Sequence, residues 1–196
     1  MSAATTEITI DSFDIRTRLA QIAKEAGDLA EFEKQMCAAK ALDPERSYPY
    51  QELYAYYDSK GRTAEALVEL EHYAILEQMQ LAPVKQLVTE YAAMSRWDKV
   101  RTYGELAMYL SPGDGEILLA LARAYGELGQ HDRAAFTYDS ALLSQPPLRR
   151  PALAHIGRAR AFLAMGDKPK ARAALKDAMK TEPENAEALK LKAEIK

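Results

Sequence analysis

Four glycines recur along the chain at nearly constant intervals, and this period constrains the fold more than any other feature of the sequence. Gly27 and Gly61 lie 34 residues apart, Gly129 follows at twice that interval, and Gly166 lies 37 residues further on. Ser95 stands at the vacant place between Gly61 and Gly129. A fixed period of this length indicates one supersecondary unit repeated in series.

The best-formed unit covers residues 115–146, and its apolar residues fall at helical spacing. A first set lies at i, i+3, i+4 and i+7, on one face of a helix, and comprises Leu118, Leu121, Ala122 and Tyr125. After the turn at Gly129 a second set follows, namely Ala134, Tyr138 and Ala141, and Pro146 ends the unit. The spacing therefore predicts a helix hairpin with two facing apolar stripes.

This unit resembles the tetratricopeptide repeat, whose 34-residue pattern calls for leucine, a small residue and an aromatic residue at set places, and then proline. The leucine column reads Leu19, Leu53, Leu87 and Leu121, with Arg158 in the fifth unit. The aromatic column reads Ala23, Tyr57, Tyr91, Tyr125 and Phe162, and the closing prolines are Pro44, Pro112, Pro146 and Pro183. Gln78 replaces the proline of the second unit, and three extra residues precede the fifth unit within "QPPLRRP".

The resemblance implies an all-α fold, a right-handed α-solenoid or superhelix of about five hairpins with a C-terminal capping helix. We expect a flexible N-terminal segment at 1–11 and a single domain at 12–196, with repeats at 13–46, 47–80, 81–114, 115–148 and 152–185 and a cap at 186–196. Helices are expected near 13–26, 29–41, 48–59, 63–77, 82–94, 97–110, 115–128, 131–144, 151–164, 168–181 and 185–195.

Five tyrosines crowd into residues 48–57, "YPYQELYAYY". At 100° per residue, Tyr50, Tyr54 and Tyr57 share the buried stripe of a helix, and Tyr56 lies at its edge. Only Tyr48 points to the opposite face, which lines the inside of a superhelix of hairpins. The cluster is therefore interpreted mainly as core.

Composition fits a globular protein, with 48% hydrophobic and 28% charged residues. Charge is uneven: residues 1–114 hold 12 basic and 19 acidic groups, and residues 115–196 hold 14 and 10. This falls short of a basic nucleic-acid-binding surface, so no nucleic acid partner is expected. Neither a secretory leader nor a membrane span is found, and Cys37 is the only cysteine, which together favour a cytoplasmic location without disulfides or membrane insertion.

Catalytic and metal-binding motifs are absent from the sequence. His72, His131 and His155 have no zinc-binding spacing, and no nucleophile elbow, Walker loop or dinucleotide fingerprint occurs. We therefore expect neither an enzyme nor a cofactor or metal.

The concave face of stacked first helices is the surface left for function. By the helical wheel its lining includes Arg18, Gln21, Tyr48, Gln51, Glu52, Lys85, Gln86, Thr89, Leu119, Arg123, Glu127 and Arg160. Lys85, Arg123 and Arg160 come from successive repeats and could pair with carboxylates of an acidic segment. A solvated charged face is the competing interpretation.

Two glycines lie in the middle of predicted first helices, where glycine costs about 1 kcal/mol relative to alanine. Gly126 and Gly157 are explained by the close approach of a neighbouring helix or of a ligand backbone, and packing is favoured. Gly104, on a second helix, is attributed to packing alone.

The sequence thus predicts a non-enzymatic interaction module, or scaffold, that binds a peptide or helix of another protein in its concave groove. One alternative is a docking or regulatory domain of a larger multidomain protein, which could be an enzyme. A second alternative is homo-oligomeric assembly, with Trp97, Tyr103 and Tyr109 on second helices as a homodimer surface.

Overall fold

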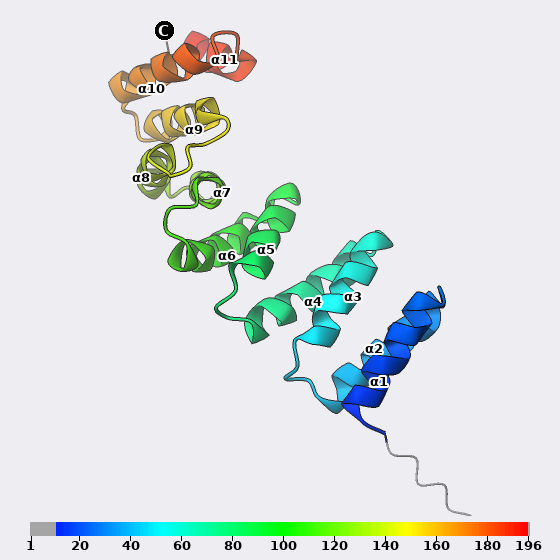
Figure 1. The fold of residues 1–196 in the computed structure, drawn as a ribbon. Coiled ribbons are helices and arrows are strands. Elements are labelled where there is room, and N and C mark those ends of the chain that lie inside the picture. The colour runs from blue at the N-terminus through cyan, green and yellow to red at the C-terminus, as the bar shows by residue number, and fades with distance from the viewer. Residues whose placement is uncertain (1–10, 196) are drawn as a thin grey trace, which may run out of the picture. The chain divides into compact units, whose positions relative to one another are not determined.

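The computed structural model describes residues 11–195, and all regular structure within this range is α-helical (Figure 1). The helices are α1 (Phe13–Glu25), α2 (Leu29–Leu42), α3 (Tyr48–Ser59), α4 (Thr63–Leu76), α5 (Leu81–Ala93), α6 (Trp97–Leu110), α7 (Gly115–Glu127), α8 (His131–Leu142), α9 (Pro151–Ala164), α10 (Lys168–Thr181) and α11 (Ala186–Glu194). Each lies within two residues of its expected limits, so the all-α helical-repeat fold is confirmed.

The expected flexible segment at 1–11 lies almost wholly outside the described residues. Its last residue is ordered, because the Asp11 carboxylate accepts hydrogen bonds from Arg16 on α1 at 2.6 and 2.7 Å. The hydrogen bond from Arg16 lowers the pKa of Asp11, and desolvation opposes this shift.

The hairpin turns explain the period of the glycines. Gly27, Gly61, Gly129 and Gly166 all have φ between 68° and 78°, the left-handed region that L-residues other than glycine rarely adopt. The amide after each glycine then bonds back to the helix, as Gln130 N does to Tyr125 O at 2.8 Å. Ser95 occupies the turn of the third hairpin with φ 56° and is the one positive-φ residue other than glycine within 11–195.

Several helix starts follow from short polar residues that cap free amides. Asp167 accepts a hydrogen bond from Lys170 N at 3.0 Å, as its place before α10 predicts. Asp114 does the same for α7, with its Oδ1 3.1 Å from Glu116 N and 3.2 Å from Ile117 N. Proline occupies the first turn of α3, α9 and α10, where its missing N–H loses no helical bond.

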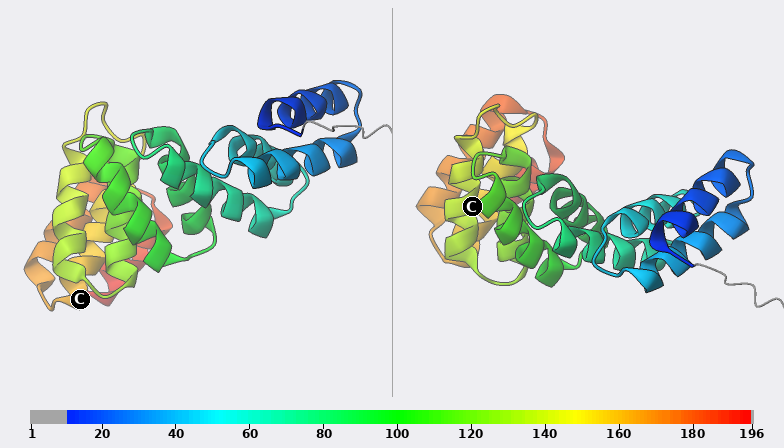
Figure 2. Two further views of the ribbon diagram at one scale, coloured as in Figure 1. Left: turned by 90° about the horizontal axis from the view of Figure 1, so that it is seen from below. Right: turned by 60° about the horizontal axis from the view of Figure 1, so that its bottom comes forward.

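The helices group into two compact units, which are described separately. In residues 11–78, α1 pairs with α2 and α3 pairs with α4, and α2 also contacts α3. In residues 79–195, α5, α7 and α9 pair with α6, α8 and α10, and α11 packs on α10 and α9 (Figure 2). That residues 12–196 form a single domain stays a prediction.

The tyrosines of α3 divide less cleanly than the helical wheel predicts. Tyr50 and Tyr57 are buried, as expected, but Tyr54 is only half-buried. Tyr48 is also half-buried and packs against the core of α1, α2 and α3, and its hydroxyl accepts a hydrogen bond from Gln21 Nε2 at 3.3 Å. Gln21 is another residue expected to line the groove, and the assignment of Tyr48 to the inner face stays a prediction.

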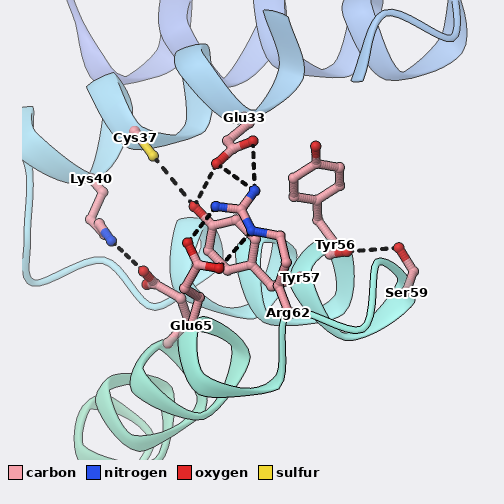
Figure 3. A network of polar contacts seen from close by, with 9 residues as sticks. Glu33, Cys37, Lys40, Tyr56, Tyr57, Ser59, Arg62 and Glu65 are labelled. Carbon is pink, nitrogen blue, oxygen red and sulfur yellow. Dashed lines mark hydrogen bonds and ion pairs between the residues drawn. The ribbon is translucent and has the colours of Figure 1, made fainter. Parts of the chain in front are cut away.

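A polar network joins α2 to α3 and to the start of α4 (Figure 3). The Glu33 carboxylate accepts hydrogen bonds from the Tyr57 hydroxyl at 3.1 Å and from Arg62 at 3.0 and 3.1 Å. Arg62 also pairs with Glu65 and stacks on the ring of Tyr57, with its guanidinium carbon 4.4 Å from the centroid. Burial raises the pKa of Tyr57, and nearby Cys37 and Glu33 raise it further. The first two hairpins are thus joined by charge-assisted bonds as well as by apolar packing.

Within the second unit, Leu121 of the leucine column packs the fourth hairpin against the third. Leu121 is fully buried, and a Cβ placed on Gly104 of α6 would lie 3.1 Å from its Cδ1. Gly104 is therefore a packing residue, as predicted. Leu19 holds the same column in the first hairpin and is 42% exposed, because the described residues provide no earlier helix to cover it.

Candidate partner-binding pocket

The first helices α7 and α9 border a pocket of about 480 Å³ in the second unit, with one residue of α11 at its edge. Its lining combines apolar, charged and glycine positions: Leu119, Arg123, Gly126, Glu127, His131, Tyr138, Leu153, Ile156, Gly157, Arg160, Ala161, Ala164 and Glu187. This volume lies within the range of ordinary ligand pockets, and aliphatic walls with a few polar groups are typical of such sites.

Tyr138 of α8 reaches this pocket although it belongs to a second helix. Its side chain is 6% exposed, and its ring tip lies against the backbone of α9 at Gly157. A Cβ at position 157 would be 2.1 Å from Tyr138 Cζ and 2.4 Å from the hydroxyl oxygen. Gly157 is therefore a packing requirement, as predicted, and the phenol occupies the space that a side chain there would fill.

Helix packing accounts for the glycine at position 157 but not for the glycine at position 126. A Cβ there would meet only Ala134, at an ordinary 3.8 Å. Helix packing thus does not require glycine at position 126, and the interpretation of Gly126 as a packing residue is not supported. It leaves the wall of α7 bare where the pocket opens.

The charged groups at the pocket carry intramolecular partners. Arg160 lies 2.7 Å from the Glu187 carboxylate, and Arg123 lies 4.0 Å from that of Glu127. The Arg123 guanidinium also stacks over the ring of Trp97, 4.7 Å from its centroid. The pocket therefore presents two cations and two anions, with no excess of either sign.

Burial and the nearby charged side chains both affect the pKa of Tyr138. Burial raises the pKa of the phenol to about 12, while the two arginines oppose the rise and the two glutamates add to it. The hydroxyl thus stays protonated at neutral pH and can donate a hydrogen bond. Among residues 11–195 it has no hydrogen-bond partner.

The pocket gathers four of the residues expected to line the groove, Leu119, Arg123, Glu127 and Arg160. Lys85 and Thr89 on α5 do not line it. Lys85 donates a hydrogen bond to Asp114 at 2.5 Å, and the Thr89 hydroxyl donates to Lys85 O at 3.1 Å. Gln86 bonds Glu90 on the same helix at 2.6 Å.

The expected groove residues of the first unit form a separate set on α1 and α3. Arg18 donates to Gln21 at 3.2 Å, and Lys24 pairs with Glu52 at 2.7 Å. Gln51 is exposed. This part of the expected site stays a prediction.

Tyr138, Leu153, Ile156 and Glu187 are pocket residues that the helical wheel does not assign to the groove. Tyr138 belongs to the buried stripe of its own helix, so a single-helix pattern assigns it to the core. The available signal is the glycine at 157, which marks a close approach on a first helix. The sequence does not say that the approaching group is a tyrosine carrying a free hydroxyl.

The aromatic surface expected on second helices is only partly present. Tyr109 is 79% exposed, but Trp97 lies half-buried under Arg123, and Tyr103 is half-buried and stacked on Tyr91 with centroids 5.8 Å apart. The exposed aromatic surface is thus corrected to a single residue.

Two further features of the described range bear on function. Among residues 11–195, no cluster of three or more histidine, cysteine, aspartate or glutamate side chains is placed to hold a metal ion. None of the helices described combines the length and apolar character needed to cross a membrane.

Two tetratricopeptide repeat family models match the second unit. One covers residues 115–147 and the other residues 151–195, which are the hairpins that form the pocket. No curated protein matches the chain.

Solved structures share the fold at low sequence identity. YrrB, described as a tetratricopeptide repeat protein with an unusual peptide-binding site, is 18% identical, with a TM-score of 0.70 over 91% of this chain and 90% of that one. A structure of MamA is 17% identical, with a TM-score of 0.64 over 89% and 93%. A tetratricopeptide repeat protein from Parabacteroides merdae is 16% identical, with a TM-score of 0.55 over 94% and 85%.

Helix hairpins that repeat in series, with glycine turns and leucine contacts between neighbours, define a helical-repeat protein of the α-solenoid class. Residues 115–147 and 151–195 match tetratricopeptide repeat models, and solved structures of tetratricopeptide repeat proteins share the fold of the chain. Members of this family are interaction modules and are in general non-catalytic.

Proposed function

We propose that this protein binds a peptide or helix of a partner protein in the pocket between α7 and α9. The observation that carries the proposal is the pocket itself, in which aliphatic walls surround a phenol hydroxyl without a partner. A structural relative described as having a peptide-binding site supports the same class of ligand.

The expectation of an acidic ligand has less support than the expectation of a peptide. Lys85, Arg123 and Arg160 were the cations expected to receive carboxylates, and each lies near a carboxylate of its own chain. A ligand carboxylate must displace these partners before it gains an arginine or lysine. Shape and apolar contact therefore contribute more to the proposed binding than net charge does.

A matched pair of leucine variants tests the proposal. Leu153→Glu places a carboxylate in the pocket wall, whereas Leu143→Glu alters a residue that is 81% exposed and outside the pocket. Random linear peptides displayed on phage are selected on the natural protein, and enriched sequences are titrated against both variants by fluorescence anisotropy. We expect Leu153→Glu to abolish binding and Leu143→Glu to leave it unchanged. Equal binding by both variants would contradict the location, provided circular dichroism shows both are folded.

A further inference from the structure

The hydroxyl of Tyr138 is a polar group of the pocket that makes no hydrogen bond to the described residues. Its side chain is more than nine-tenths buried, and the hydroxyl has no hydrogen-bond partner among the described residues. The hydroxyl oxygen is not one of the buried polar atoms that lack a partner, so it is open to the pocket that its side chain lines. A ligand acceptor in the pocket can therefore take the place of water on this hydroxyl.

Gly126 and Gly157 determine how closely a ligand can approach this hydroxyl. Both line the pocket from neighbouring first helices, but the ring of Tyr138 covers the backbone at Gly157, whereas the backbone at Gly126 is open to the pocket. Tyr138 itself accounts for Gly157, but no intramolecular contact accounts for Gly126. The bare backbone of α7 at Gly126, beside the Tyr138 hydroxyl, suits a ligand main chain, because glycine permits close backbone approach.

The acceptor is more consistent with an uncharged carbonyl than with a carboxylate. Arg160 is held by Glu187, and Arg123 lies between Trp97 and Glu127. The two glutamates would repel an incoming carboxylate as strongly as the arginines attract it. A main-chain carbonyl meets the phenol without disturbing either pair.

The walls of the pocket select the neighbouring part of the ligand. Leu119 on α7 and Leu153, Ile156 and Ala161 on α9 are aliphatic, and the rings of Tyr138 and His131 are the aromatic groups that line the pocket. An aliphatic or small aromatic side chain of the ligand can therefore be buried there, at about 25 cal/mol per Å² of apolar surface removed from water.

We propose that the pocket recognises an uncharged, extended peptide segment. One main-chain carbonyl accepts a hydrogen bond from the Tyr138 hydroxyl over Gly126 and Gly157, and an adjacent apolar side chain packs on Leu119 and Leu153. This inference rests on the proposed function and adds the ligand chemistry to it.

Tyr138→Phe is the decisive variant, because it removes only the oxygen. The hydroxyl has no partner in the chain, so its removal should leave the melting temperature unchanged. Tyr109→Phe, at an exposed tyrosine of α6 outside the pocket, is the matched control. The probes are synthetic, fluorescent copies of the phage-selected peptides, together with versions in which every aspartate and glutamate is replaced by asparagine and glutamine.

We expect Tyr138→Phe to weaken binding about 3- to 10-fold, the equivalent of one ordinary hydrogen bond. Tyr109→Phe should bind as the natural protein does, and the uncharged peptide versions should bind within about 2-fold of the originals. Peptides that bind Tyr138→Phe and the natural protein equally would overturn the role of the hydroxyl. Binding that disappears with the peptide carboxylates would overturn the uncharged ligand.

The leucine pair separates these results from failure of the proposed function. Loss of binding in Leu153→Glu together with unchanged binding in Tyr138→Phe retains the pocket and rejects the hydrogen bond. Unchanged binding in both variants rejects the pocket as well. Selection that enriches no binding peptide counts against both proposals.

Discussion

The guanidinium of Arg158 on α9 donates a hydrogen bond of 2.5 Å to the carboxylate of Asp139 on α8. Arg158 holds the column that is leucine in the other hairpins, and it makes the same kind of contact, to the second helix of the preceding hairpin. A second carboxylate, that of Asp177 on α10, lies 3.5 Å from it. Arg158 thus joins three helices at a position where the other hairpins have a leucine.

Replacing Arg158 by leucine should restore the ordinary apolar contact. The Arg158 side chain is 19% exposed, and its buried Nε has no hydrogen-bond partner within the described part of the chain. Ion pairs in such places are often no more stabilising than well-packed apolar residues. We expect Arg158→Leu to leave the free energy of unfolding unchanged or to raise it by up to about 1 kcal/mol.

Arg158→Ala separates packing from charge at the same position. It removes the aliphatic stem as well as the guanidinium, and we expect it to lower the free energy of unfolding by about 1–3 kcal/mol. Both variants are measured by urea denaturation followed by circular dichroism. If Arg158→Leu lowers the free energy of unfolding as much as Arg158→Ala does, the ion pairs of Arg158 stabilise the contact more than leucine packing can.

Gly157→Ala and Gly126→Ala should have opposite effects although both add one methyl group to a first helix. At position 157 the methyl collides with the ring of Tyr138, and overpacking of this kind costs about 1–3 kcal/mol. At position 126 the methyl finds room, and the gain in helix propensity is up to about 1 kcal/mol. Thermal unfolding of the two variants measures the difference, and a similar shift in both would contradict the packing assigned to Gly157.

The fold could be predicted from the sequence because the residues that determine each hairpin lie close together in the chain and recur in every unit. The glycine turns, the first-turn prolines and the apolar stripes of each hairpin depend on neighbours within one unit. The exposure of Leu19 could not be predicted from its column, because that column is buried by the preceding hairpin. Position in the array, rather than residue type, determines whether this leucine is covered.

The pocket was only partly predictable, for a different reason. Arg123 and Arg160 follow from the helical wheel, but their partners Glu127 and Glu187 balance them. Only the folded arrangement shows that charge balance. The contribution of Tyr138 depends on a glycine of the next hairpin, and no pattern within one helix contains that pairing.

Ser95→Gly should stabilise the protein. Ser95 adopts φ 56° in a turn where the other four hairpins place glycine. The left-handed conformation costs an L-residue roughly 1–2 kcal/mol, and glycine avoids this cost. Glycine also makes the unfolded chain more flexible, which offsets part of the gain in stability. We expect a net gain of about 0.5–1 kcal/mol in the free energy of unfolding.

The matched control for that change is the reverse substitution, Gly27→Ser, at the same place in the first hairpin. Gly27 has φ 78°, and nothing lies within 4 Å of a Cβ built there. The serine therefore meets no steric obstacle, and backbone conformation alone should lower the free energy of unfolding. If neither substitution changes the urea midpoint, left-handed strain is not what places glycine in these turns.

Asp114 gives the second unit an acid-sensitive stability. Burial of Asp114 favours its neutral form, but hydrogen bonds from Lys85 and from the amides of Ile117 and Glu116 outweigh it and lower the pKa. A carboxyl whose pKa is lower in the folded chain stabilises that chain when ionised. This contribution is complete above the ordinary pKa of about 3.9 and is lost as the pH falls through the lower folded value.

Asp114→Asn isolates that contribution, because asparagine still caps α7 but cannot ionise. The natural protein should be more stable than Asp114→Asn at pH 7, and the difference should shrink as the pH falls below about 4. Lys85→Met removes the ammonium group, so it should raise the pKa of Asp114 in the folded chain. The stability that ionised Asp114 contributes should then be lost at a higher pH. Urea denaturation between neutral and acidic pH measures all three proteins. A difference between the natural protein and Asp114→Asn that stays constant across this range would show that ionisation of Asp114 does not contribute to the stability of the second unit.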